Sequence, residues 1–543
     1  MFNTIDYIRA LSLDYLATEE TRIASGSSLS FHTHGEHAFV FVRQETLGIV
    51  LQFGEARHTG RAAAGQWFLV PPFCECLVEN LSSDRPTGIV IVKFRCTSKR
   101  RFAGAGSGAH SLLPAERAGL VKFRCPQVQS WIRDFTDNAR MGTAGYYYQL
   151  QAHLYGLASA FSLTLQMPRE PEAELQDYVE QTRRYMLEQY YEPTDMEEIA
   201  RSSGVSASRF YQAFRRRTGL SPHKYLTKTR LQAALTLLAD SNLPILNVAH
   251  TVGYPDEYYF SRLFKKQMGL SPTEYAMLAK RKVACLSPVF RGDLSVLGIT
   301  PHMNLERGWM EYPEEALRQV AEAGPELIFT PPVTADIYQG LIEIAPVVML
   351  DWKKYSWKKR LLDLAEPLGM SGVAERWLGY FEAKTENARA LIRRELGDEP
   401  MLVVNVSLSG LYRVYGMQIR KMRDLFYEDL QVIPPESVRQ IDVLDVRSVE
   451  QLAALDCAHV LFLVDVGVTE ELCAELEHTW RSLNRQRSRQ RCLFIRAPHP
   501  LLNNAAVHDS MVDQTMDYMS AVGSELTGVP GFPLDPHPSL RQR

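Results

Sequence analysis

Three features that would assign a protein to a class at once are missing from this sequence. Its 543 residues include only 8 cysteines, too few for a fold of this size to depend on disulfides. No window approaches about 18 consecutive apolar residues, and no basic segment followed by an apolar one opens the chain. The net charge is -3, which gives no overall attraction to nucleic acid or anionic lipid. These absences predict a cytoplasmic protein with reduced thiols that is neither exported nor membrane-spanning.

The length and composition predict several folded domains. At about 100–200 residues per domain, three or four are expected, and 45% hydrophobic with 23% charged residues is a globular balance. Residues 20–97 alternate short β-rich runs with glycine and polar breaks, which predicts a small all-β barrel or sandwich. A helical period over residues 126–166 predicts two helices packed on it.

Two boundaries divide the rest of the chain. A link rich in proline and glutamate, residues 168–174, precedes a purely helical stretch that ends near residue 282. Beyond it, β-rich runs alternate with helical ones, as in α/β domains with parallel sheets. One long helix is expected at residues 371–396, between two lobes, and the tail after residue 527 is expected to fray. The predicted domains are therefore residues 1–167, 175–282 and 283–527.

The helical stretch contains an internal repeat with a period of 50 residues. In each copy a short helix reaches a glycine, Gly204 or Gly253, and a second helix starts about three residues later, which is helix-turn-helix spacing. The seven repeated identities are Phe210, Phe214, Gly219, Leu220, Ser221, Pro222 and Tyr225, which recur as Phe260, Phe264, Gly269, Leu270, Ser271, Pro272 and Tyr275. The expected N-caps are Thr194 (with Glu197 as a capping box), Ser206, Asp256, Ser221 and Ser271.

The same stretch carries a local excess of positive charge. Residues 175–282 hold sixteen Lys and Arg against eleven Asp and Glu. A recognition helix places its N-terminal side chains on base edges and its later cations near phosphates. The residues expected to read bases are Ser208, Tyr211, Gln212, Glu257, Tyr258 and Arg262. The cations expected near phosphates are Arg209, Arg215, Arg216, Arg217, Lys265 and Lys266. The alternative is a solvated polar face of a protein-binding helical domain.

The second repeat carries a specific signature, residues 248–254 followed by residues 259–272. With it, residues 175–282 resemble the DNA-binding domain of AraC-type transcriptional regulators. In that family two helix-turn-helix units bind successive major-groove turns of one DNA face, so the resemblance implies double-stranded DNA and RNA polymerase as partners. Pro255 departs from the small polar residue common there, and we expect it to alter the turn but not the pattern of cations.

Two short motifs in the first domain have the spacing of cupin motifs. They consist of Gly26, His32 and His34, then Gly65, Pro71 and Asn80. The domain thus resembles the cupin-like sensor barrel of AraC-type proteins. A catalytic cupin needs three histidines and a carboxylate around its metal, but the expected positions hold Ala38, Phe39 and Cys76. We therefore expect no metal, no cofactor and no catalytic residue.

Two alternatives for this barrel stay open. A residual metal site could use His32, His34, His37 and Cys76, since imidazole and thiolate suit zinc or iron. Cys74 and Cys76 could form a redox pair.

Four segments of the α/β stretch carry a further resemblance. They are residues 286–301, 325–329, 343–348 and 425–430. Through them, residues 283–527 resemble the substrate-binding proteins of ferric-siderophore and haem importers, in which one rigid helix joins two α/β lobes. Those proteins normally lie outside the membrane. Fused to a DNA-binding region and without an export signal, this domain is expected to sense its ligand rather than deliver it.

Ligands of open α/β lobes bind at the carboxyl ends of the strands. This places Arg291 on one rim of the cleft and Arg413 with Tyr415 on the other. Guanidinium and aromatic groups suit a ferric catecholate or hydroxamate complex. Further expected ligand residues are Trp352, Lys353, Arg420 and Lys421. The N-lobe loop at residues 301–312 has Arg307 as its one Lys or Arg, so a neutral iron chelate stays open.

The sequence as a whole predicts a cytoplasmic transcriptional regulator, an activator of iron-siderophore uptake genes, in which a chelate closes the C-terminal cleft. A homodimer is an expected assembly. One rival is a metal-dependent cupin enzyme fused to a regulator. The other is a regulator whose C-terminal domain only mediates dimerisation.

Overall fold

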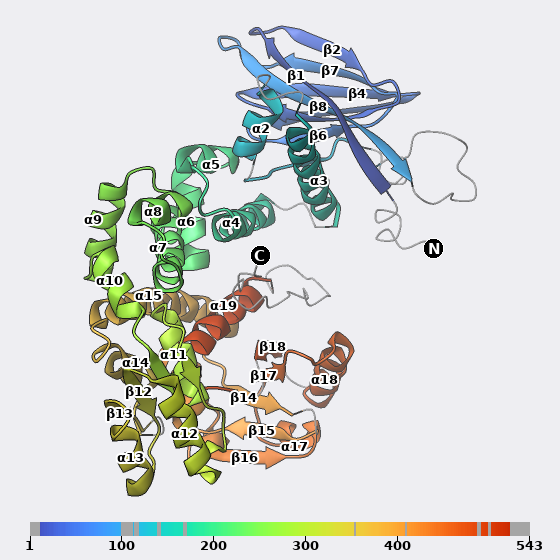
Figure 1. Ribbon diagram of the computed structural model, residues 1–543. Coiled ribbons are helices and arrows are strands. Elements are labelled where there is room, and N and C mark those ends of the chain that lie inside the picture. Colours follow the sequence, from blue (N-terminus) through green and yellow to red (C-terminus); the bar gives the residue numbers. More distant parts are fainter. Residues whose placement is uncertain are drawn as a thin grey trace. The chain divides into compact units, whose positions relative to one another are not determined.

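The chain forms two compact units, and the division falls at the end of the first recognition helix. The computed structural model describes residues 11–98, 112, 119–126, 128–137, 143–166, 171–351, 354–407, 410–485, 490–497 and 501–521, so Trp352, Lys353 and the tail after residue 527 lie outside it. One unit comprises residues 1–215 with 221–223, and the other residues 216–220 with 224–543. Each unit therefore combines one helix-turn-helix with one of the flanking domains (Figure 1).

The first unit opens with two antiparallel sheets. One has the strand order β1-β8-β3-β6-β9 and the other β2-β7-β4-β5. The strands are β1 Leu11–Ile23, β2 Ser28–His32, β3 His37–Val42, β4 Thr46–Phe53, β5 Ala56–Ala63, β6 Trp67–Val70, β7 Glu75–Asn80, β8 Thr87–Ser98 and β9 Lys122–Phe123. Strand β7 alternates exposed and buried residues, as expected of a sheet with one solvated face, whereas β3 and β6 are buried throughout.

Helices cover one of these sheets and continue into the first helix-turn-helix. The predicted pair is present as α2 Val128–Thr136 and α3 Ala144–Gln166. Their apolar residues, Phe135 and Phe161 among them, join Phe39 and Phe123 of the sheet in one core. Helices α4 Pro171–Glu188, α5 Met196–Ser202 and most of α6 Ala207–Thr218 complete the unit. The prediction of an antiparallel β domain with two packed helices is confirmed at this level.

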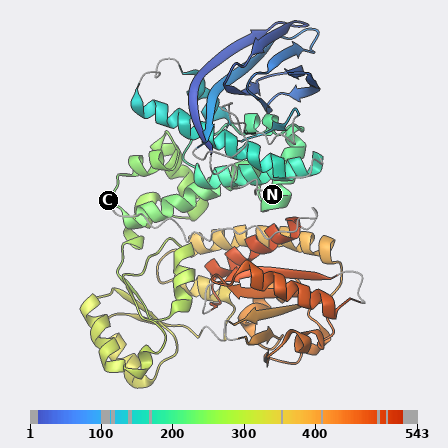
Figure 2. The same ribbon diagram turned by 90° about the vertical axis from the view of Figure 1, so that its right-hand side faces the viewer.

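The second unit contains a two-lobed α/β domain (Figure 2). The N-lobe sheet has the order β11-β10-β12-β13 and is parallel throughout, whereas the C-lobe sheet has the order β16-β15-β14-β17-β18. Helix α15 Ser371–Leu396 stands between the lobes in the chain, with the predicted bounds. The strands are β10 Val283–Cys285, β11 Met303–Asn304, β12 Leu327–Thr330, β13 Val347–Met349, β14 Met401–Val406, β15 Tyr412–Tyr415, β16 Val443–Val446, β17 His459–Asp465 and β18 Arg491–Ala497.

The C-lobe sheet is only partly parallel, which the sequence did not predict. Strands β14, β17 and β18 are parallel, but β15 and β16 pair antiparallel at one edge. The helices of the two lobes are α11 Pro288–Val296, α12 Pro313–Ala323, α13 Ala335–Ile342, α14 Trp357–Ala365, α16 Arg420–Met422, α17 Val449–Ala453, α18 Glu470–Leu483 and α19 Ala505–Ala521, with short turns η2 Trp309–Glu311, η3 Arg423–Asp429 and η4 Glu436–Val438. Helix α19 packs on α15 and β18 and also on α11 and α14, so it contacts both lobes.

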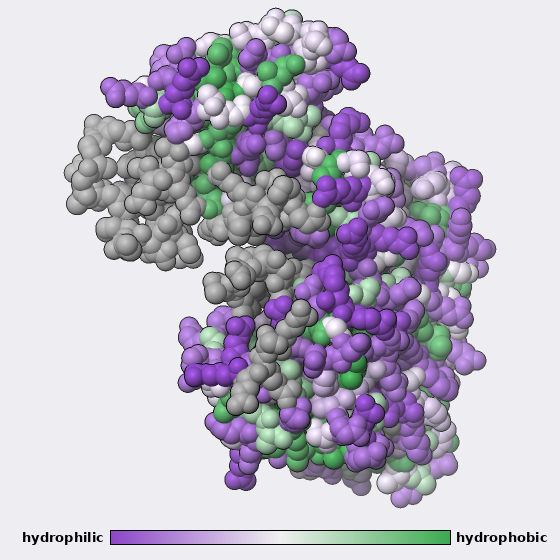
Figure 3. Space-filling view, turned by 180° about the vertical axis from the view of Figure 1, so that it is seen from behind, coloured by the Kyte–Doolittle hydropathy of each residue, from purple (hydrophilic) through white to green (hydrophobic). Residues whose placement is uncertain are grey.

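Four helices of the DNA-binding region also belong to the second unit. They are α7 Pro222–Asp240 from residue 224 onward, α8 Ile245–Thr251, α9 Glu257–Met268 and α10 Pro272–Ala279. Among the described residues no helix is long and apolar enough to cross a membrane. The face of the molecule in Figure 3 is mainly hydrophilic, with hydrophobic residues in small separate groups.

Candidate DNA-reading and ligand-binding sites

The first helix-turn-helix consists of α5 and α6. Gly204 in the turn has φ +81°, the left-handed conformation that glycine adopts without steric cost. The N-cap of α5 is Asp195, whose side chain accepts bonds from the Glu197 and Glu198 amides. Thr194 instead donates to the Glu192 carbonyl at 2.9 Å, so the predicted cap was one residue too early. A carboxylate suits this position because it also faces the positive end of the helix dipole.

The N-terminal domain contacts this turn through Arg124. Its Nη1 atom donates to the Ala64 carbonyl at 2.9 Å and also to the Ser202 carbonyl at the end of α5. A Cβ atom on Gly204 would lie 2.3 Å from Arg124 Nη2. The backbone conformation therefore favours glycine here, and a larger residue would also displace the guanidinium group of Arg124.

The second helix-turn-helix, α8 and α9, has the same geometry. Gly253 has φ +85°, and Asp256 is the N-cap of α9, as predicted. Ser271 forms a complete capping box with Glu274 at the start of α10. Pro255 lies in the turn before α9, with its carbonyl 3.2 Å from His250 Nε2.

Most of the predicted DNA-contacting side chains lie on the exposed faces of α6 and α9. Phe210, Phe214, Phe260 and Phe264 are buried, which leaves the opposite face of each helix to solvent. The exposed predicted residues are Ser208, Arg209, Gln212, Arg215, Arg216, Tyr258, Arg262, Lys265 and Lys266, whereas Tyr211 and Glu257 are half-buried. Tyr258 is 79% exposed, unusual for an aromatic side chain and favourable for stacking or for contact with DNA.

Arg217 is an exception among the predicted phosphate contacts. It follows Phe210 and Phe214 by seven and three residues on α6, so it shares their inward face. Its guanidinium group pairs with Asp517 of α19, and its side chain is only 10% exposed. The prediction that Arg217 lies near phosphates treated every cation at the end of α6 alike. Its spacing from the two phenylalanines could have distinguished Arg217 from the exposed cations of α6.

Arg291, the ligand residue predicted on the N-lobe rim, lies on a short helix. Arg291 is in α11 and pairs with Glu306 at 2.9 Å. The neighbouring Trp309 indole donates to the Leu286 carbonyl at 2.8 Å, which holds the segment after β11 against the end of β10. Arg307, in this segment, is exposed.

The C-lobe residues gather around the antiparallel edge. Arg413 lies within β15, not in a loop, and forms a two-armed pair with Asp445 of β16, with both N–O distances 2.7 Å. Tyr415 is almost completely buried, and Lys421 Nζ lies 5.7 Å from its ring centre. Burial, together with the charges of Arg307 and Arg413, lowers the pKa of Lys421 to about 8.

Arg420 approaches a buried carboxylate. Its Nη1 atom lies 3.9 Å from Asp424 Oδ2. Burial, helped by the charge of Glu428, raises the pKa of Asp424 to about 6.

The cupin-like positions do not converge on one point. The rings of His32 and His34 lie 5.0 Å apart, whereas His37 and Cys76 are completely buried. Burial lowers the pKa of His37 to about 4 and raises that of Cys76 above its usual range. Among the described residues no three His, Cys, Asp or Glu side chains could hold a metal ion together.

Comparison with known proteins gives the family. A helix-turn-helix domain family matches residues 199–277. The MmsAB operon regulatory protein of Pseudomonas aeruginosa is 33% identical over 274 residues, which cover 49% of this chain and 84% of that protein. The chain belongs to the AraC family of transcriptional regulators. The HTH-type transcriptional activator Btr of Bacillus subtilis is 26% identical over 369 residues, covering 63% of this chain and 68% of that protein.

Family membership settles the function class. This AraC-family protein is a DNA-binding transcriptional regulator and not an enzyme, so the cupin-enzyme rival is wrong. A siderophore-binding protein from Vibrio cholerae, solved with Fe3+-Desferal, covers 45% of the regulator at 17% identity and a TM-score of 0.36. The two-lobed architecture follows from the two strand orders and from helix α15 between the lobes.

Proposed function

We propose that this regulator activates iron-siderophore uptake genes and senses a ferric siderophore or related chelate with its C-terminal domain. The observation that carries the proposal is a group of cations at the antiparallel edge of the C-lobe: Arg413, paired with Asp445, and Lys421, over the Tyr415 ring, with the charge of Arg307 acting on Lys421. Arg307 comes from the N-lobe and the other two from the C-lobe. A bound anion would relieve their mutual repulsion and so draw the two segments together.

The other parts of the proposal have separate support. The Bacillus subtilis relative is named as an activator, which favours activation and RNA polymerase as a partner. We infer a cytoplasmic location and a homodimer assembled through a cupin-like N-terminal barrel. The division into residues 1–167, 175–282 and 283–527 belongs to the same proposal, with 175–282 as the shared DNA-binding region.

The charge group predicts which chelates bind. An anionic ferric tris-catecholate should bind in preference to ferrioxamine B, because three cations favour negative charge. Lys421→Ala should weaken tris-catecholate binding about tenfold or more, the size of a lost charge-assisted bond. Affinity should also fall as pH rises above about 8, since the anion binds the protonated form of Lys421.

Fluorescence titration of the full chain with both chelates between pH 6 and pH 10 measures these effects. Arg481→Ala is the matched control, because it removes an exposed cation of α18 that pairs with Glu477. It should leave the affinity and its pH dependence unchanged. If neither chelate bound the wild-type chain at any pH, the dimerisation rival would replace the sensor proposal.

Base contacts and phosphate contacts of α9 predict different losses of DNA binding. Arg262→Ala should cost about 1–3 kcal/mol on a specific duplex and relax base preference at one position. Lys265→Ala should weaken specific and random duplexes alike and reduce the salt dependence of binding. Both side chains are exposed on α9 and no change in folding is expected. The measurement is the affinity of each variant for both kinds of duplex at several salt concentrations. Equal losses of affinity in the two variants on both duplexes would contradict the assignment of Arg262 to bases and Lys265 to phosphates.

A further inference from the structure

The two copies of the internal repeat contact the same helix of the C-terminal domain. Gly219 and Gly269 occupy equivalent positions, and both have positive φ, +76° and +78°. A Cβ atom on Gly219 would lie 2.8 Å from the Ala383 carbonyl of α15, and one on Gly269 would lie 3.6 Å from Gly372 Cα at the start of α15. The turn after each recognition helix therefore lies directly against the backbone of α15.

Side chains at equivalent positions of the two repeats also contact the C-terminal domain. Arg217 and Gln267 are again equivalent, fifty residues apart. Arg217 pairs with Asp517 of α19, and Gln267 accepts a hydrogen bond from Arg376 of α15. Asn387 of α15 also donates to the Arg216 carbonyl at the end of α6. The same position of both repeats is thus bonded to the C-terminal domain.

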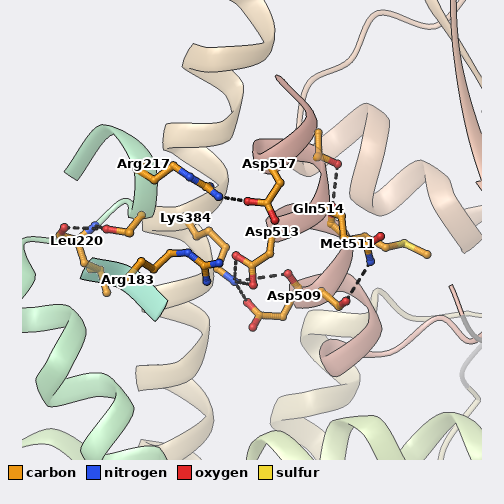
Figure 4. Close-up of polar contacts among 12 residues, drawn as sticks. Arg183, Arg217, Leu220, Lys384, Asp509, Met511, Asp513, Gln514 and Asp517 are labelled. Atoms are coloured by element: carbon orange, nitrogen blue, oxygen red, sulfur yellow. Dashed lines mark hydrogen bonds and ion pairs between the residues drawn. The ribbon is translucent and has the colours of Figure 1, made fainter. Parts of the chain in front are cut away.

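Helix α19 adds an acidic face to this contact. Asp509, Asp513 and Asp517 are spaced by four residues and so lie along one side of the helix. Lys384 of α15 is 9% exposed and lies 2.5 Å from Asp509 Oδ1 and 3.0 Å from Asp513 (Figure 4). Burial opposes the charge of Lys384, but the two carboxylates outweigh it and raise its pKa.

A further cation reaches the same group from the DNA-binding region. Lys228 of α7 is half-buried, and its Nζ atom lies 5.8 Å from the ring centre of Tyr380 of α15. Burial lowers the pKa of Lys228, opposed by the charge of Asp509. Cations of the DNA-binding region and carboxylates of α19 thus meet in a group that solvent screens only in part.

We propose that α15 and α19 form a coupling interface through which the C-terminal domain positions the ends of both recognition helices. Arg217 and Lys384 act here as positioning residues, not as DNA contacts. The link from a ligand to this interface rests on the proposed sensing function. Helix α15 joins the lobes and α19 contacts both of them, so a rearrangement of the lobes moves the surface on which both repeats lie.

Charge reversal and charge exchange in the full chain test the proposal. Arg217→Glu and Asp517→Arg should each lower the affinity by about fivefold or more for a duplex that the wild type selects from random sequence. Amide exchange of residues 207–218 should also accelerate in both. The double exchange, Arg217→Glu with Asp517→Arg, should restore both quantities to within about twofold of wild type, since it re-forms the pair.

The double exchange separates positioning from direct DNA contact. If Arg217 touched phosphate, Asp517→Arg would not weaken binding and the exchanged pair would bind as poorly as Arg217→Glu. That result, or unchanged amide exchange in both single variants, would overturn the proposal. Arg481→Glu, on the exposed face of α18, is the control and should change neither quantity. If a reversal prevents folding by circular dichroism, Asp517→Asn and Asp513→Asn test the same contacts with the same criteria.

A third measurement keeps the two proposals distinguishable. The ratio of DNA affinities with and without ferric tris-catecholate should fall toward one in Arg217→Glu, with chelate affinity unchanged. A wild-type ratio retained in that variant would overturn the coupling interface. A wild-type chain that binds no chelate would contradict the sensing function alone, because the DNA-affinity and amide-exchange tests use no ligand.

Discussion

Arg360→Met is expected to destabilise the C-terminal domain by about 3–5 kcal/mol, because it leaves a buried carboxylate without its partner. Arg360 of α14 and Asp293 of α11 are both buried, with Nε and Oδ2 2.6 Å apart. The same guanidinium group donates to the Asn503 carbonyl at 2.6 Å, and Asp293 accepts from the Ala505 amide at the start of α19. Removing the arginine therefore disrupts the contact between two N-lobe helices and α19.

The loss can be measured by pulse proteolysis in urea, following products from residues 283–521 by mass spectrometry. Lys359→Met is the matched control on the same helix, since its pair with Asp363 is exposed and should not affect stability. If Arg360→Met had the same urea midpoint as the control, the ion pair would stabilise the domain no more than a buried methionine does.

The sequence predicted elements best where local periodicity and end signals agree. Helix α15 has the predicted bounds, because a sustained helical period marks it and polar breaks end it. Strand β1 was missed because it mixes charged residues into an exposed edge of its sheet. Strands β15 and β16 were missed because antiparallel pairing at a sheet edge needs no helix between strands, so the alternation of strand and helix gave no sign of it.

Contacts between distant segments were the least predictable part of the sites. The repeat and its capping residues indicated which faces of α6 and α9 are exposed, since both follow from local spacing. No local pattern connects Arg217 with Asp517, or Arg307 with Lys421, because each pair is more than 100 residues apart in the chain. The sequence did not predict a strand at Arg413 for the same reason: its partner Asp445 belongs to a strand pairing that only the folded sheet reveals.

The packing of α19 on the N-lobe helices α11 and α14 is expected to lose about 2 kcal/mol of stability between pH 7 and pH 5 because of His508. Its ring is buried against Trp357, and within the described residues neither ring nitrogen has a hydrogen-bond partner. Burial lowers the pKa of His508 to about 3, and the charges of Arg360 and Lys358 act in the same direction. The unfolded chain takes up a proton below pH 6.5 and the folded one does not, so acid favours unfolding down to about pH 3.

Amide exchange of α14 and α19, corrected for intrinsic rates, reports this free energy locally. His508→Leu should flatten its dependence on pH between 7 and 5, whereas His478→Leu, an exposed histidine of α18, should leave the dependence intact. An unchanged slope in His508→Leu would assign the acid sensitivity to other groups. Because α19 carries Asp509, Asp513 and Asp517, protonation of His508 should also loosen the coupling interface, so exchange at residues 207–218 should rise at pH 5 in the wild type and less in His508→Leu.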